Sequence, residues 1–121
     1  MTTLAWLGSW LGAFALTQVV EMGVYANTPG PPRPLRERLA IAFGASAITH
    51  PIVWFVITPL YLPLELDWWT LVTVAEIFAF VTEGLWMAAF SHRPSYAFGA
   101  SLLANGLSFT IGLFCYELLG W

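Results

Sequence analysis

The sequence predicts an all-α fold, a four-span transmembrane helical bundle that forms a single integral membrane domain over residues 1–121. The composition points to lipid as the solvent. Hydrophobic residues make up 59% of the chain and charged residues only 9%, whereas soluble domains are roughly 45–50% apolar and about 25% charged. The mean hydropathy is +0.74. This composition cannot cover a surface that faces water, so soluble enzymes and disordered proteins are excluded.

Four apolar stretches are long enough to cross a bilayer, which takes about 20 helical residues per crossing. They cover residues 4–26, 39–60, 68–90 and 96–119. The first connection, residues 27–38, contains four prolines and a glycine, which forbid a helix there. Within the second span, Pro51 follows His50 and is expected to kink the helix. The kink would leave the carbonyl of Ala47 to Thr49 or to a water molecule.

The charged residues of the connections differ between the two sides of the predicted bundle. All four basic residues lie in the first and third connections, whereas the second connection carries only Glu65 and Asp67. The basic residues are Arg33, Arg36, Arg38 and Arg93. The positive-inside rule makes their side cytoplasmic, so both termini are expected on the non-cytoplasmic side of a bacterial-type cytoplasmic (inner) membrane. Four basic against seven acidic residues also give no basic patch for a nucleic acid.

A short sequence recurs in the second and fourth spans. The segment AFGAS occupies residues 42–46 and again residues 97–101, with Arg38 and Arg93 four residues before the two copies. The first and third spans align at Glu21 and Glu83. These matches predict two helical hairpins that point the same way, as in proteins with parallel repeats. Small residues are common in membrane helices, so a chance likeness is the alternative.

Five polar residues inside the spans are the candidates for a functional site: Glu21, His50, Glu76, Glu83 and Asn105. An ionisable group at the centre of a bilayer costs about 3 kcal/mol and normally faces the bundle interior or a water-filled cavity. Glu76 and Glu83 are two helical turns apart and therefore share a face. With a rise of about 1.5 Å per residue, the five residues lie between about 7 and about 20 Å along the helices from the end of the bundle that carries the arginines. We expect them to converge inside the bundle.

The spans contain three carboxylic acids and no arginine or lysine, so the acids must be protonated or hold a cation. We expect the protein to bind and move a proton or small cation. Glu83 and Glu76 would accept the proton or cation, and His50 would relay it. Asn105 would orient an acceptor. Glu21 would be the acid nearest the end that carries the arginines.

Two alternatives are open. Neutral glutamic acids can serve only as hydrogen-bonding contacts between helices. The chain can also be an accessory or assembly subunit of a larger membrane complex. The expected partners are the lipid bilayer and either further copies of the chain or such a complex.

An enzymatic role is less favoured, and the sequence requires no cofactor. If a metal binds, His50, Glu76 and Glu83 are the available ligands, since imidazole and carboxylate groups bind zinc or iron. This is a thin ligand set, and the chain has no HExxH motif. One haem or chlorophyll on His50 is a further alternative. Cys115 is the single cysteine and cannot form an internal disulfide.

Overall fold

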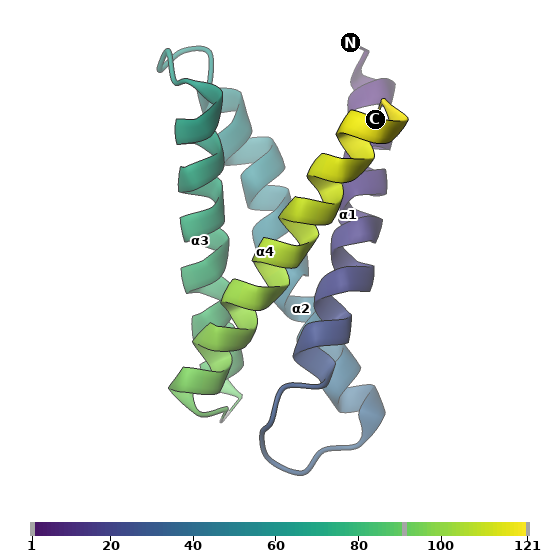
Figure 1. The fold of residues 1–121 in the computed structure, drawn as a ribbon, viewed down its shortest axis with the longest axis vertical. Coiled ribbons are helices and arrows are strands. Elements are labelled where there is room, and N and C mark those ends of the chain that lie inside the picture. Colours follow the sequence, from purple (N-terminus) through teal and green to yellow (C-terminus); the bar gives the residue numbers. More distant parts are fainter. Residues whose placement is uncertain (1, 91, 121) are drawn as a thin grey trace.

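The computed structural model describes residues 2–90 and 92–120 as a bundle of four long helices (Figure 1). The helices are α1 (Thr3–Ala26), α2 (Leu35–Ile52), α3 (Trp68–Ala89) and α4 (Pro94–Leu119). A π-helical segment, η1 (Val53–Ile57), and a 3-10 turn, η2 (Thr58–Leu60), extend α2. All four segments are long and apolar enough to cross a membrane. The predicted all-α, four-span bundle is therefore confirmed.

The second helix begins earlier than the sequence suggested. The predicted span started at residue 39, but α2 starts at Leu35, directly after Pro34. Pro34 is the N-cap and has an extended backbone, with φ −62° and ψ 153°. A proline fits at the start of a helix because the N–H that it lacks would have no partner there. The prolines therefore shorten the first connection to residues 27–34 and place Arg36 and Arg38 on the first turns of α2.

The helix type changes just after Pro51, and the expected kink stays a prediction. Regular α-helix continues one residue beyond it, to Ile52, and then gives way to the wider π-helical turn of η1. The hydroxyl of Thr58 donates to the carbonyl of Val53, at 2.8 Å. The expectation that Thr49 would bond the carbonyl of Ala47 is wrong. The Thr49 hydroxyl lies 3.4 Å from the carbonyl of Ala45 instead, and it also reaches the carboxyl group of Glu83.

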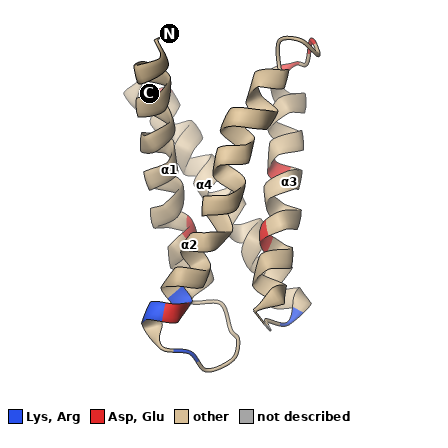
Figure 2. Ribbon diagram, turned by 180° about the vertical axis from the view of Figure 1, so that it is seen from behind, with Lys and Arg blue, Asp and Glu red and all other residues tan. Residues whose placement is uncertain are grey.

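The two hairpins, α1–α2 and α3–α4, point the same way, with both chain termini at one end of the bundle (Figure 1). The connection between α1 and α2 and the turn between α3 and α4 lie at the opposite end. Figure 2 shows that the arginines gather at that end, while acidic residues also occur midway along the helices. We call this the basic end. Each helix of one hairpin packs against a helix of the other, α1 on α4 and α2 on α3.

The burial pattern differs from that of a soluble protein. Many large apolar side chains such as Leu4 and Leu102 are exposed, whereas seven polar side chains are buried among the residues that the structure describes. The buried polar residues are Gln18, Glu21, Ser46, Thr49, Glu83, Ser101 and Asn105. Lipid is the solvent that makes such an arrangement favourable, because apolar surface is stable there and charged groups are not. The protein is an integral membrane protein whose polar residues face inward.

The AFGAS segments have matching environments in the two hairpins. Ala42 and Ala97 are fully buried, and so are Ser46 and Ser101, which occupy the last position of each copy. Glu21 and Glu83, aligned in the same comparison, are each 1% exposed. These equal burials agree with the predicted repeat, and the duplication itself stays a prediction.

Candidate functional site

Glu83 on α3 is held by side chains from all three other helices. Its Oε2 accepts hydrogen bonds from the hydroxyl of Tyr25 on α1 and from Nδ2 of Asn105 on α4, the latter at 3.0 Å. Its Oε1 accepts a hydrogen bond from the hydroxyl of Thr49 on α2. All three donors are neutral groups. The carboxyl group is therefore well supplied with donors but has no positive partner.

A small residue lets α3 and α4 approach closely beside Glu83. A Cβ atom placed on Gly84 would lie 2.3 Å from the ring of Phe98, so a larger residue there would force the ring or the helices to shift. The Ser101 hydroxyl donates to the carbonyl of Phe80 at 2.8 Å and ties the two helices together. Nδ2 of Asn105 also donates to the carbonyl of Ser101, at 3.0 Å. These contacts fix the amide of Asn105 in the position from which it reaches Glu83.

Glu21 on α1 is the second fully enclosed carboxyl group. It accepts hydrogen bonds from the hydroxyl of Ser46 on α2 and, at 2.6 Å, from the hydroxyl of Ser108 on α4. One turn earlier, Nε2 of Gln18 donates to the carbonyl of Phe43 at 3.2 Å and aligns α1 with α2. Glu21, like Glu83, is surrounded by neutral donors.

Both carboxyl groups line one partly open cavity of about 120 Å³ between the helices. The five residues singled out from the sequence all line it: Glu21, His50, Glu76, Glu83 and Asn105. Thr17, Thr49 and Ser108 complete the polar part of its wall. We call this space the acidic cavity. The structure thus brings the five residues together, and their role in binding stays a prediction.

His50 and Glu76 differ from the two enclosed acids because they lack hydrogen-bond partners. Nδ1 of His50 is buried and unpaired, and Glu76 makes no hydrogen bond or ion pair with any residue that the structure describes. The imidazole is packed among aromatic rings, with its centroid 5.4 Å from Phe14 and 6.0 Å from Trp54. Trp54 belongs to η1, so the π-helical turn after Pro51 positions one wall of this histidine.

No cation balances the acidic cavity. Within residues 2–90 and 92–120, the one ion pair joins Arg33 and Glu37 at the basic end, with 3.9 Å between Nη1 and Oε2. Removing an ion from water costs several kcal/mol, and neutral donors replace only part of its hydration. None of the described ion pairs therefore balances an acid of this cavity.

The described residues contain no group of three His, Cys, Asp or Glu side chains close enough to hold a metal ion. His50, Glu76 and Glu83, named above as the available ligands, thus do not form such a group here. The groups around Glu83 and Glu21 are hydroxyl and amide N–H donors, which satisfy a carboxyl group as a hydrogen-bond acceptor.

Sequence reasoning did not assign the four hydroxyl-bearing residues that bond the acids directly, which are Tyr25, Ser46, Thr49 and Ser108. Ser46 reads as a small packing residue and Tyr25 as an aromatic residue near the end of a span. Thr49 and Ser108 count among the polar residues of the spans, but neither was assigned as the partner of an acid. Tyr25 did leave a signal, because it follows Glu21 by four residues and therefore shares its helix face.

Comparisons of the chain with protein-family models, with curated proteins and with solved structures found no match.

Proposed function

We propose that this integral membrane protein binds a proton or a small cation in the acidic cavity and exchanges it between the two sides of the membrane. The observation that carries the proposal is the pair of carboxyl groups, Glu21 and Glu83, each 1% exposed and hydrogen-bonded to neutral donors alone. Both face the cavity that Glu76 and His50 also line. An excess of acids without a basic partner is stable in lipid only while something positive is bound.

The hydroxyl groups around Glu83 suit it to gaining and losing a proton. A hydroxyl can donate one hydrogen bond and accept others, and it reverses its role by rotating about one bond. When Glu83 is ionised, Tyr25 and Thr49 donate to it, as in the structure. When Glu83 is protonated, one hydroxyl can turn and accept from the carboxyl group. Glu83 can therefore keep its hydrogen bonds in the ionised and in the protonated state without movement of the backbone.

The remaining cavity residues would carry the proton or cation along the bundle. Glu76 lies two turns from Glu83 on the same helix, about 10 Å away along its axis, and it is the acid with no partner. His50, on the adjacent α2, can accept a proton at an unpaired ring nitrogen. Asn105 orients Glu83, and Glu21 is the acid nearer the basic end. By the positive-inside rule this end is cytoplasmic, in a bacterial-type inner membrane.

Proton flux into liposomes tests the proposal. Purified protein is reconstituted with a pH-sensitive dye inside the vesicles, and a potassium diffusion potential drives the flux. We expect E83Q to abolish the dye response, because glutamine cannot take up a proton. The matched control is E117Q, since Glu117 is an exposed acid near the end of α4. Repeating the assay with sodium or potassium gradients at constant pH distinguishes a cation from a proton.

Infrared spectroscopy adds a readout that a purely structural role would not produce. A carboxyl group that exchanges protons gives a carbonyl band that fades as the pH rises, and E83Q would remove this band. A band that persists at every pH, together with equal fluxes for E83Q and the parent, would contradict the proposal. The glutamic acids would then be neutral contacts between helices.

The second candidate is an accessory subunit of a larger membrane complex, and the unpaired carboxyl group of Glu76 favours it. A basic or polar group of another chain could meet this acid. Size-exclusion chromatography of the purified chain separates the two candidates. A stable, monodisperse homo-oligomer supports transport by the chain itself, whereas aggregation that only a co-purified partner prevents supports the subunit role.

A further inference from the structure

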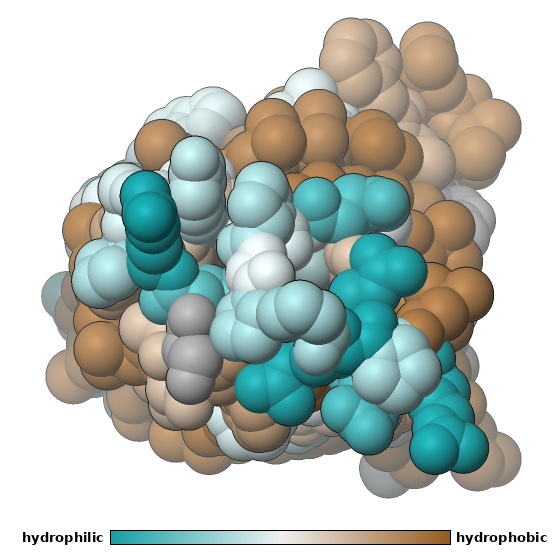
Figure 3. Space-filling model, turned by 90° about the horizontal axis from the view of Figure 1, so that it is seen from below, coloured by the Kyte–Doolittle hydropathy of each residue, from teal (hydrophilic) through white to brown (hydrophobic). Residues whose placement is uncertain are grey.

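A second cavity lies at the basic end, separate in its lining from the acidic cavity. Its volume is about 300 Å³, and it lies between the connection joining α1 to α2 and the turn before α4. Arg33, Arg38 and His92 supply its basic lining, and no aspartate or glutamate takes part in it. Figure 3 views the molecule from this end and shows hydrophilic residues gathered there, with hydrophobic residues around them. We call this space the arginine pocket.

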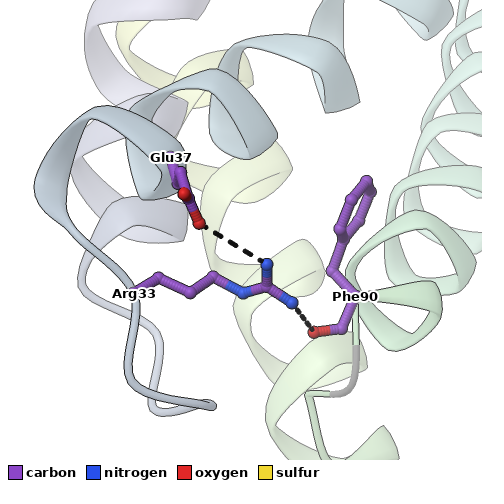
Figure 4. Close-up of polar contacts among 3 residues, drawn as sticks. All are labelled: Arg33, Glu37 and Phe90. Atoms are coloured by element: carbon purple, nitrogen blue, oxygen red, sulfur yellow. Dashed lines mark hydrogen bonds and ion pairs between the residues drawn. The ribbon is translucent and has the colours of Figure 1, made fainter.

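The two arginines are held in place mainly by neutral acceptors. Nη2 of Arg33 donates to the carbonyl of Phe90 at 3.1 Å, as Figure 4 shows. Nη1 of Arg38 donates to the carbonyl of Ala26 at 2.8 Å. Backbone carbonyls orient a guanidinium group without cancelling its charge. A guanidinium group has five N–H donors, so most of them are left without a protein partner.

The one acid near these arginines neutralises them only in part. Glu37 lies 3.9 Å from Nη1 of Arg33 (Figure 4), and its side chain is 49% exposed. Exposed ion pairs at such distances contribute little. Arg38 has no acidic partner among the residues that the structure describes. The pocket therefore keeps a net positive charge.

His92 and Gly30 also line the pocket, and they lie close together. Nδ1 of His92 donates to the carbonyl of Met87 at 2.9 Å, because a carbonyl oxygen can only accept. Met87 bonds only Nδ1, so it does not occupy Nε2, the other ring nitrogen. A Cβ on Gly30 would lie 2.6 Å from this Nε2, so the glycine allows the proline-rich connection to pack directly against the imidazole. The wall of the pocket is thus closely packed where Gly30 meets His92.

We propose that the arginine pocket binds an oxyanion of the phosphate class. Fixed guanidinium groups with free donors match the oxygens of a phosphate, which arginine recognises by paired hydrogen bonds. A volume of about 300 Å³ has room for a phosphate together with the group that carries it. The ligand is a phospholipid headgroup at the membrane surface or a free phosphate compound, and both share this chemistry. The inference does not depend on the proton or cation site.

The experiment compares R38Q with R36Q in the complete protein. Arg36 lies in the same segment but is exposed and does not line the pocket, so R36Q removes the same charge and tests for nonspecific attraction. One arm measures binding of inorganic phosphate to detergent-purified protein by calorimetry. The other arm uses native mass spectrometry to compare retention of phosphatidylglycerol and phosphatidylcholine from nanodiscs. We expect R38Q to weaken binding about tenfold or more, and R36Q to change it less than about twofold.

Each outcome decides the proposal. Phosphate binding that R38Q weakens supports a soluble ligand, and retention of phosphatidylglycerol alone that R38Q weakens supports a lipid headgroup. If R38Q and R36Q behave alike in both arms, or neither probe binds, the arginines only hold the connections in place and the proposal is overturned. Because Arg38 also bonds the end of α1, R38Q can unfold the protein. In that case R33Q is measured by the same criteria, with thermal unfolding as the control for folding.

Discussion

Replacing Tyr25 by phenylalanine removes one hydroxyl group from the acidic cavity and leaves the ring in place. Glu83 then loses one donor and keeps those of Thr49 and Asn105. Hydrogen bonds between neutral groups in membrane proteins contribute about 0.6 kcal/mol on average, whereas bonds to a charged group contribute about 1.5–3 kcal/mol. The amount by which Y25F lowers the free energy of unfolding therefore indicates whether Glu83 is charged or neutral.

If Glu83 exchanges a proton, the effect of Y25F on stability depends on pH. The Tyr25 hydroxyl stabilises the ionised carboxylate more than the neutral acid, so the loss should be about 0.6 kcal/mol at low pH and should rise toward about 2 kcal/mol as the pH rises. Reversible unfolding in detergent micelles measures the free energy at each pH. A double-mutant cycle of Y25F with E83Q isolates the interaction between the two side chains.

The matched control is Y116F, because Tyr116 is an exposed tyrosine of α4. It should change the free energy of unfolding very little at any pH. A loss for Y25F that stays near 0.6 kcal/mol across the whole range would mean that Glu83 is always neutral, and the reasoning from excess charge would fail. No loss at all would mean that the hydroxyl does not bond Glu83.

Two further predictions concern helix packing and the start of α3. Substitution of Gly84 by alanine forces a Cβ against Phe98 and should destabilise the bundle by about 1–3 kcal/mol in unfolding measurements. Alanine at Gly106, where a Cβ meets nothing within 4 Å, should be neutral or stabilising by comparison. Hydrogen bonds from the side chain and the N–H of Thr70 lower the pKa of Asp67, the N-cap of α3. At pH values above the ordinary pKa of an aspartate, about 3.9, Asp67 should therefore stabilise the protein. This stabilisation should be lost as the pH falls through the lowered pKa that Asp67 has in the folded state. Unfolding measured against pH should show this acid-side loss in the parent and a smaller one in D67N. An equal loss of stability at acid pH in the parent and in D67N would contradict this prediction.

The spans were predictable from the sequence because hydrophobic length and proline position are local properties. Every span boundary of residues 4–26, 68–90 and 96–119 lies within two residues of the observed helix. The start of α2 was misplaced because prolines were taken to exclude helix throughout the connection, although Pro34 is compatible with a helix that begins at the next residue. Pro51 indicated a disturbance of the second helix, but the sequence did not show that it would take the form of a π-helical turn.

The grouping of the candidate residues was predictable from energetics, but their partners were not. Acids in lipid must face inward, and this argument found Glu21, Glu76 and Glu83 without any knowledge of helix rotation. Which serine, threonine or tyrosine would meet them depends on how each helix is turned about its axis. These helices are apolar around most of their circumference, so sequence periodicity says little about that rotation.

The distribution of Glu83's partners over three other helices has a consequence for biosynthesis. When α3 enters the bilayer, the preceding helices already offer Tyr25 and Thr49, but Asn105 follows only with α4, because chains emerge and fold from the N-terminus. An acid in a span is disfavoured during insertion by roughly 2.5–3.5 kcal/mol. The first hairpin is therefore placed to receive α3 as it leaves the translocon and to shelter its carboxyl group until the last helix arrives.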